Sequence, residues 1–165
     1  MAEKVRIGLI GTGRIGKLHG TNIQNLVPNA EIVIAADPFM NEETREWAAG
    51  LGIPRTSADP EEVFADPEVD AVFICSSTAT HADFIIRAAG AGKHIFCEKP
   101  IHTDIGKIQE ALRAVEEAGV KLQIGFVRKF DRSHRAVRDV VASGKLGAPY
   151  VVKICSRDPE APSME

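Results

Sequence analysis

The feature that most constrains this sequence is a short apolar run that leads directly into three closely spaced glycines. Residues 5–10 read Val-Arg-Ile-Gly-Leu-Ile, and Gly11, Gly13 and Gly16 follow with the spacing G-x-G-x-x-G. The run is too short for a helix and rich in residues that favour strands, whereas the apolar residues after Gly13 repeat with helical spacing. The pattern predicts a strand, a tight turn and a helix.

The three glycines fit the phosphate-binding turn of a dinucleotide site. We expect Gly11 to make the tight turn, Gly13 to leave room for a pyrophosphate, and Gly16 to let the helix pack against the strand. The first turn of the helix would then offer free N–H groups and a partial positive charge to the phosphates. Glycines also mark plain turns, so a turn without a ligand is the alternative.

A second apolar run favours the dinucleotide. Residues 32–36 lead into Asp37, which lies 21 residues after Gly16. At this position an acidic side chain accepts hydrogen bonds from the adenosine ribose. Asp37 would also repel the 2′-phosphate of NADP, and Pro38 and Phe39 supply no compensating cation. We therefore expect NAD as the cofactor.

The remainder of the chain alternates strands with helices, which predicts parallel βαβ units in a doubly wound α/β sheet. Glycines and prolines separate the segments. The helix that follows the Ser76–Ser77 loop is expected to begin with a capping box made by Thr80 and Asp83. Beyond residue 37, we expect strands near residue 53 and over residues 69–75, 93–97 and 120–124. We expect helices over residues 41–49, 82–91, 104–118 and 131–143, and a short helix that begins at residue 59.

The pattern also suggests where one domain ends. Residues 1–125 are predicted to form the dinucleotide-binding Rossmann domain, and residues 126–165 a connecting helix and the start of a second domain. Residues 148–155 have strand character but nothing downstream to pair with. The simplest explanation is that they form the first strand of a truncated second α/β domain, whose remainder lies outside this sequence.

Charge and cysteine content argue against several classes of function. The net charge of −3, without a basic run, argues against nucleic acid as a partner. No apolar stretch approaches the length of a membrane span and no signal region follows Met1, so we expect a cytoplasmic protein with no membrane partner. Cys75, Cys97 and Cys155 lack C-x-x-C spacing and fall in predicted strands. We interpret them as core residues and expect no metal site.

The expected cofactor-binding residues lie in the loops that follow the predicted strands, because ligands of doubly wound sheets bind at the carboxyl ends of the strands. Thr78 and His81 are expected on the nicotinamide side, although Thr80 beside them has the alternative role of a helix cap. His19 and His134 are expected on helix surfaces. The full set of expected cofactor-binding residues is Gly11, Thr12, Gly13, Arg14, Ile15, Gly16, Asp37, Ser76, Ser77, Thr78, His81, Glu98, Lys99 and Pro100.

Five stretches of the sequence coincide with the motifs of one family: residues 11–19, 37–38, 77–81, 98–100 and 125–131. Together they resemble the family of glucose-fructose oxidoreductases and inositol dehydrogenases (Gfo/Idh/MocA), and the Glu-Lys-Pro triplet at 98–100 is the most specific of them. The stretch from Gly125 and the Arg157-Asp-Pro segment are most similar to the inositol 2-dehydrogenase branch. The resemblance implies an N-terminal Rossmann domain and a C-terminal α/β domain with a large open sheet, through which family members assemble as homo-oligomers.

The resemblance also implies an NAD-dependent oxidation of a secondary alcohol of a cyclic polyol or sugar. Lys99 would be the catalytic residue and contact the substrate, either taking or relaying the hydroxyl proton in a desolvated pocket or polarising the hydroxyl oxygen. Arg128 is a second substrate candidate, because a guanidinium can hold hydroxyls or carboxylates. For both, a solvated surface charge is the alternative. Three roles are open for Glu98: it could orient Lys99, contact the cofactor or be purely structural. Pro100 could carry a cis peptide bond, which the sequence does not show.

The sequence departs from the family pattern in one respect. That pattern continues with a glycine-rich segment carrying an Asp and then a His, and nothing in this sequence matches it. We therefore expect residues 1–165 to bind NAD but to turn over poorly or not at all. A non-catalytic NAD-binding regulatory module is the alternative, although the intact triplet at 98–100 counts against it. A methyltransferase is disfavoured by the spacing through Gly16 and by Lys99.

Overall fold

The computed structural model describes residues 4–155 of the chain. The chain divides into two compact units, the first ending at Phe126 and the second beginning at Val127. All strands of the described residues belong to the first unit, which also contains the loops that carry most of the expected site residues.

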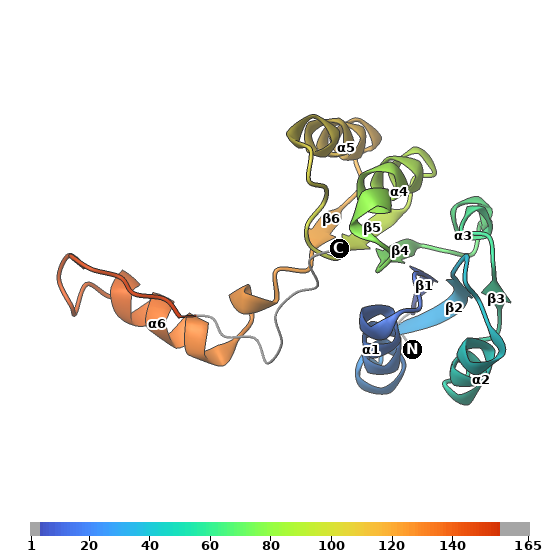
Figure 1. Ribbon diagram of the computed structural model, residues 1–165, viewed down its shortest axis with the longest axis horizontal. Coiled ribbons are helices and arrows are strands. Elements are labelled where there is room, and N and C mark those ends of the chain that lie inside the picture. The colour runs from blue at the N-terminus through green and yellow to red at the C-terminus, as the bar shows by residue number, and fades with distance from the viewer. Residues whose placement is uncertain (1–3, 156–165) are drawn as a thin grey trace. The chain divides into compact units, whose positions relative to one another are not determined.

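The first unit is built on a sheet of six parallel strands in the order β3-β2-β1-β4-β5-β6 (Figure 1). The chain enters in the middle of the sheet and winds outward in both directions. This order confirms the predicted doubly wound α/β fold. The strands are β1 (Val5–Ile10), β2 (Ala30–Ala36), β3 (Thr56–Ser57), β4 (Ala71–Ile74), β5 (His94–Cys97) and β6 (Leu122–Ile124).

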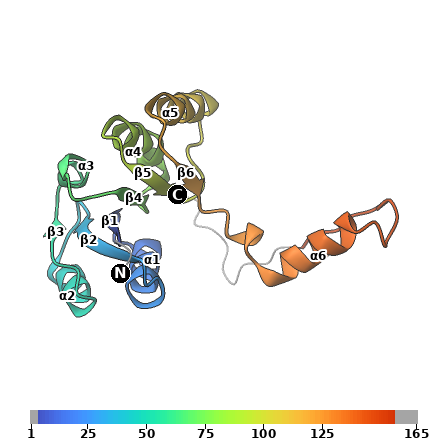
Figure 2. The same cartoon turned by 180° about the vertical axis from the view of Figure 1, so that it is seen from behind.

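Helices cover both faces of this sheet (Figure 1, Figure 2). On one face lie α1 (Arg14–Leu26) and α2 (Glu42–Gly50), and on the other α3 (Glu61–Ala65), α4 (Thr78–Gly90) and α5 (Ile105–Ala118). Within residues 4–155, no helix combines the length and apolar character needed to cross a membrane.

Each face has its own core, because successive side chains of a strand point to opposite sides. In β1, Leu9 joins the core that includes Ile23 of α1. Its neighbour Ile10 joins the core that includes Val63 of α3 and Ile85 of α4. Both faces of the central strands are therefore buried, which explains why these strands read as continuous apolar runs.

The third strand differs from the prediction. It was expected near Ile53 but forms at Thr56–Ser57. Ile53 is buried in the core beneath α2, and Pro54 after it has no N–H to donate to a neighbouring strand. Pairing with β2 starts only at Arg55, whose carbonyl accepts a hydrogen bond from Ala35 N–H.

The start of α4 also differs from the prediction. The helix begins at Thr78, four residues before the expected start at residue 82. The Thr80 hydroxyl donates to the carbonyl oxygen of Ser77 at 2.8 Å within the first turn. Thr80 therefore lies inside the helix, and the predicted capping box with Asp83 is wrong.

The second unit contains a short 3-10 helix, Val127–Lys129, and α6 (Arg132–Ala142). Asp131 caps α6, since its side chain accepts a hydrogen bond from His134 N–H at 3.0 Å. The expected strand over residues 148–155 is not formed, and residues 151–155 are exposed. The described residues offer no partner strand there, and a strand requires one for its backbone hydrogen bonds. The segment at Arg157 lies outside the described residues.

Candidate functional site

A cavity of about 500 Å³ opens at the carboxyl-end edge of the sheet. The strands β1 and β4 are neighbours there, and the chain leaves them toward opposite halves of the sheet, which creates a crevice between their loops. This volume is typical of a small-molecule site. The lining comes from the ends of β1, β2 and β4, the loops after them, and α4: Ile10, Gly11, Gly13, Asp37, Pro38, Phe39, Cys75, Ser76, Ser77, Thr80 and Phe84.

The three glycines of the loop after β1 have different surroundings. Gly11 has a φ of +90°, and a Cβ there would lie 2.5 Å from the backbone of Cys75 and Ser76. A Cβ on Gly16 would lie 1.9 Å from the carbonyl oxygen of Gly11. At Gly13, by contrast, an added Cβ would meet nothing within 4 Å. Gly11 and Gly16 are thus required by the protein itself, whereas Gly13 leaves open space of the kind a pyrophosphate needs.

The N-terminus of α1 faces this open space with its backbone groups unused. The cap residue is Gly13, and no side chain caps the first turn in the described structure. The first turn also contains no acidic residue. Free N–H groups and the helix dipole make such an end a suitable site for phosphate.

Asp37, at the end of β2, is held in place by the glycine loop. Its Oδ2 accepts hydrogen bonds from the Thr12 N–H at 2.6 Å and the Thr12 hydroxyl at 3.0 Å. Its Oδ1 accepts from the Phe39 N–H at 2.8 Å. Thr12 is 5% exposed. It therefore fixes the orientation of a carboxylate that lines the cavity and retains accepting capacity for a ribose hydroxyl.

The loop after β4 contributes differently from the prediction. Ser76 and Ser77 line the cavity, as do Thr80 and Phe84, which the sequence did not single out for this role. Their i, i+4 spacing, which places both on one face of α4, is the signal that could have identified them.

His81 does not line the cavity, because its ring is buried with only 2% of the residue exposed. Its Nδ1 lies 2.7 Å from the carbonyl oxygen of Pro100, and its Nε2 lies 3.0 Å from that of Ser76. His81 therefore connects the loop after β4 with the turn after β5. Thr78, Arg14, Ile15 and Glu98–Pro100 also lie outside the cavity lining.

The turn after β5 carries Lys99. Glu98 is buried, and its Oε2 accepts a hydrogen bond from the Lys99 N–H at 3.2 Å. The Lys99–Pro100 peptide bond is cis, a point that the sequence left open. The Lys99 side chain is exposed in this unit, so the desolvated pocket expected around it is not formed by the described residues.

The prediction that His19 lies on a helix surface is wrong. Its side chain is 21% exposed, and its Nε2 lies 2.8 Å from Glu98 Oε1. The ring also packs edge-on against Phe96, with centroids 5.1 Å apart. The buried residues Gly16, Gly20 and Ile23 mark the sheet-facing side of α1. The helical position of His19 between them is the signal that could have placed it there.

The two buried cysteines, Cys75 and Cys97, are not poised for chemistry. Burial, with a smaller contribution from the Glu98 carboxylate, raises the pKa of Cys75 and of Cys97 to about 12. Cys155 is exposed, so its predicted core position is wrong, because the strand expected to bury it does not form. Among residues 4–155, no cluster of three or more His, Cys, Asp or Glu side chains could hold a metal ion.

The remaining candidates lie in the second unit. Arg128 is exposed and lies 4.0 Å from the Asp131 carboxylate. Its role toward a substrate stays a prediction. His134 is exposed on α6 and contacts the same carboxylate at 2.9 Å, as expected of a surface residue.

A parallel sheet of this order, a glycine loop opening a helix, and a carboxylate ending the second strand define a dinucleotide-binding Rossmann domain. Residues 5–126 match the model of an oxidoreductase family described as having an NAD-binding Rossmann fold. The chain belongs to this family, the Gfo/Idh/MocA oxidoreductases, and NAD is the cofactor of its Rossmann domain.

Relatives and solved structures agree with this assignment. The chain is 39% identical, over 98% of its length, to the myo-inositol 2-dehydrogenase of Thermotoga maritima. It is also 39% identical over its whole length to the scyllo-inositol 2-dehydrogenase (NAD(+)) of Bacillus subtilis. In each case it covers 48% of the relative, so the chain spans about half the length of these curated proteins.

One solved structure is of scyllo-inositol dehydrogenase from Lactobacillus casei with bound cofactor NAD(H) and scyllo-inositol. It matches 88% of this chain with a TM-score of 0.82 and 35% identity, and the match covers 43% of that protein.

Proposed function

We propose that this chain is the cofactor-binding half of an NAD-dependent dehydrogenase that oxidises a secondary alcohol of a cyclic polyol or sugar. The observation that carries the proposal is the location of Lys99. It follows β5 at the same sheet edge as the cavity, and Glu98 and His81 hold the backbone on either side of it. The inositol dehydrogenases among the relatives suggest the substrate class.

Lys99 has the chemistry that this reaction requires. The glycine loop and Asp37 would hold NAD, which would supply the hydride acceptor for the carbinol carbon. The hydroxyl proton must leave as well, and the Lys99 amine would take it or relay it to water. Arg128 would hold other hydroxyls of the substrate through its guanidinium.

Replacement of Lys99 tests the catalytic part of the proposal. In a chain of the relatives' full length that carries these residues, Lys99→Ala should lower kcat by about a hundredfold or more and leave the Kd for NAD nearly unchanged. Lys121→Ala, at an exposed lysine of the same unit, is the matched control and should behave as wild type. A Lys99→Ala enzyme with normal turnover would contradict the proposed role of Lys99. Absence of turnover in the wild-type chain of that length, with NAD binding intact, would favour a non-catalytic NAD-binding regulatory module.

Residues 1–165 alone are proposed to bind NAD and to turn over poorly or not at all. Titration calorimetry with NAD, beside a turnover assay on inositols and other polyols, tests both halves of this statement. Rapid polyol oxidation by residues 1–165 would show that the second half is wrong.

Asp37 is proposed to set the preference for NAD over NADP, because its carboxylate would repel the 2′-phosphate. Asp37→Ala should weaken NAD binding by about tenfold, the equivalent of one lost hydrogen bond to a ribose hydroxyl, and reduce the preference for NAD. Asp83→Ala, at an exposed position of α4, should change neither. Equal affinity of the wild-type chain for the two cofactors would contradict this role.

The assembly and location of the full-length protein are also proposals. We expect a homo-oligomer in the cytoplasm. Light scattering from a relatives-length chain and cell fractionation test the two statements separately.

A further inference from the structure

A half-buried histidine and a buried carboxylate meet directly behind the Lys99 turn. Glu98 is 7% exposed, and each of its carboxylate oxygens has one partner. The Oε1 atom lies 2.8 Å from His19 Nε2, and the Oε2 atom accepts the Lys99 N–H at 3.2 Å. With its hydrogen on Nε2, the His19 ring donates to this carboxylate.

We propose that His19 is a positioning residue for Lys99, acting through the Glu98 carboxylate; this rests on the proposed role of Lys99. A buried carboxylate requires hydrogen-bond donors, because leaving an oxygen unpartnered there is costly. Without the His19 donor, Glu98 would turn toward water or another partner. That rotation would withdraw Oε2 from the Lys99 backbone.

The surroundings of the pair leave it little freedom. The His19 ring packs edge-on against Phe96, with centroids 5.1 Å apart, and against Phe73, with centroids 6.2 Å apart. A Cβ at Gly125 would lie 3.0 Å from Glu98 Oε1. Glycine at this position therefore lets the chain after β6 pass close to the carboxylate, and the same closeness prevents Glu98 from swinging in that direction.

The pair connects two parts of the proposed site that lie far apart in the sequence. His19 belongs to α1, the helix that begins at the glycine loop, and it is 79 residues from Glu98. The path from α1 to the Lys99 backbone consists of two hydrogen bonds through one carboxylate. The inference is that the helix facing the cofactor phosphates also sets the position of the amine that would face the reacting alcohol.

The test compares His19→Leu with His19→Gln, since the glutamine amide can place a donor near the position of the histidine Nε2. Amide hydrogen exchange in residues 1–165 is measured by NMR at Lys99 and at Gly125, whose N–H bonds the Cys97 carbonyl. His19→Leu should speed exchange at Lys99 by about tenfold and leave Gly125 and the Kd for NAD nearly unchanged. His19→Gln should restore slow exchange at Lys99. Leu18→Gln, at an exposed neighbour on α1, is the control.

Two results would overturn the proposal: unchanged exchange at Lys99 in His19→Leu, or equal acceleration at Lys99 and Gly125, which would indicate a general packing role. In a relatives-length enzyme, His19→Leu should lower kcat by about ten- to a hundredfold, with recovery in His19→Gln. A Lys99→Ala enzyme with normal turnover would refute the proposed function, whereas the exchange measurement tests the hydrogen-bond path independently of turnover.

Discussion

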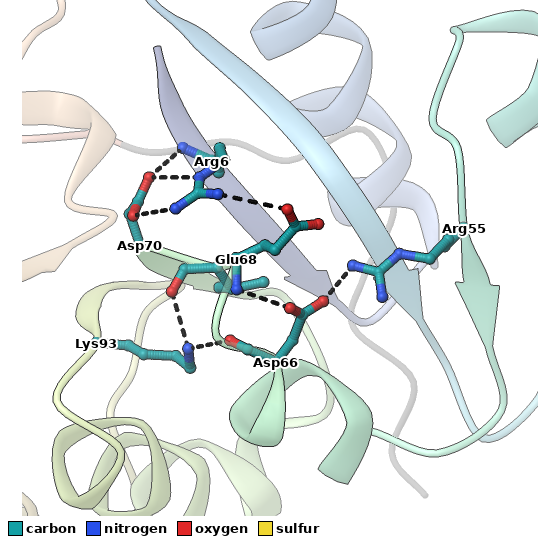
Figure 3. A network of polar contacts seen from close by, with 7 residues as sticks. Arg6, Arg55, Asp66, Glu68, Asp70 and Lys93 are labelled. Atoms are coloured by element: carbon teal, nitrogen blue, oxygen red, sulfur yellow. Dashed lines mark hydrogen bonds and ion pairs between the residues drawn. The ribbon is translucent and has the colours of Figure 1, made fainter. Parts of the chain in front are cut away.

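The two edges of the same sheet use polar side chains in opposite ways. At the amino-end edge, residues at the start of β1 and in the loops that lead into the other strands form a network of ion pairs and hydrogen bonds among themselves (Figure 3). At the carboxyl-end edge, an open cavity is lined by the glycine loop, the Asp37 carboxylate, serine and threonine hydroxyls, and apolar side chains that include Phe39 and Phe84. The first edge satisfies its own polar groups, and the second leaves them available to a ligand.

Arg6 and Asp70 form one half of the amino-end network. The Asp70 carboxylate accepts the Arg6 N–H at 2.8 Å and its guanidinium at 3.3 Å, and Glu68 lies 3.7 Å from the same guanidinium. The backbone N–H of Arg6, followed by its guanidinium, lowers the pKa of Asp70. These contacts tie the start of β1 to the start of β4.

Lys93 and Asp66 form the other half. Lys93 is 6% exposed, and its Nζ donates to the carbonyl oxygens of Asp66 and Val69 at 2.6 and 2.8 Å. Desolvation lowers the pKa of Lys93 against the opposing effect of the nearby carboxylates. Burial acts to raise the pKa of Asp66, but the Arg55 guanidinium and the Glu68 N–H outweigh it and lower that pKa.

The Glu98–His19 pair is an exception to this comparison, because it brings a buried carboxylate with a partner on each oxygen to the carboxyl-end edge. We interpret the pair as an internal hydrogen bond that holds the backbone of Lys99 in position at the otherwise open edge. We therefore expect substitutions at the amino-end edge to change stability and those at the carboxyl-end edge to change cofactor binding. The glycines of the loop after β1 are the positions where one substitution can change both.

The largest effect on stability is expected from Gly16→Ala. This glycine lies at the carboxyl-end edge, yet its replacement should affect folding as well as cofactor binding. Its Cβ would lie 1.9 Å from the Gly11 carbonyl oxygen, so α1 must move away from β1. We expect the free energy of unfolding to fall by about 3 kcal/mol or more, as measured by urea unfolding. Gly50→Ala, where a Cβ meets nothing within 4 Å, is the control. A stable Gly16→Ala protein would mean that the tight packing of α1 is not required.

At the amino-end edge, Lys93→Met should lower the free energy of unfolding by about 2–3 kcal/mol. The Val69 carbonyl oxygen loses its donor, and the Asp66 carbonyl oxygen keeps only the longer bond from the Val69 N–H at 3.3 Å. Lys121→Met, at an exposed lysine, should change it by less than about 0.5 kcal/mol. The Kd of the folded protein for NAD should be unaffected. A large change in NAD affinity in Lys93→Met would show that the two edges are coupled.

Gly13→Ala should have the opposite effect from Lys93→Met: it should weaken NAD binding and leave the free energy of unfolding nearly unchanged. Gly13 has a φ of −67°, which alanine adopts freely, and its added Cβ would meet no protein atom. Stability should therefore change by less than about 1 kcal/mol, because the lower entropy of the unfolded alanine chain opposes the poorer fit of alanine at an N-cap. The Kd for NAD should rise by about tenfold or more, since the methyl group occupies the space proposed for the pyrophosphate. Calorimetric titration and urea unfolding on the same preparation separate the two effects. Unchanged NAD affinity would contradict the proposed position of the phosphates.

The sequence predicted the carboxyl-end edge much better than the contacts behind it. The glycine spacing and the position of Asp37 are local signals, and they were sufficient for the sheet class and for part of the cavity lining. The Glu98–His19 contact joins residues 79 apart, and no local period reports such a pair. The network around Lys93 is also long-range, and no local pattern around this lysine indicates that it is buried.

The errors at the strand level have a similar cause. Ile53 has strand character, but tertiary packing places it in the core beneath α2, and the pairing with β2 starts beyond Pro54. Residues 148–155 have strand composition without a partner. Composition alone therefore identifies residues that can form a strand, and the availability of a neighbouring edge decides whether they do.

The smallest expected effect is the acid dependence of the amino-end network. A carboxyl group whose pKa is lower in the folded state than in the unfolded chain stabilises the fold at neutral pH, and this contribution is lost as the pH falls. For Asp66 and Asp70 the loss should begin as the pH approaches their ordinary value of 3.8 and continue below it. Asp66→Asn should therefore lower the free energy of unfolding at pH 7, and the difference from wild type should shrink as the pH is lowered toward 3.8 and beyond. Urea unfolding across this pH range measures the difference, and Asp83→Asn is the exposed control. A difference that is the same at every pH would contradict the stabilising role of the ionised Asp66 carboxylate.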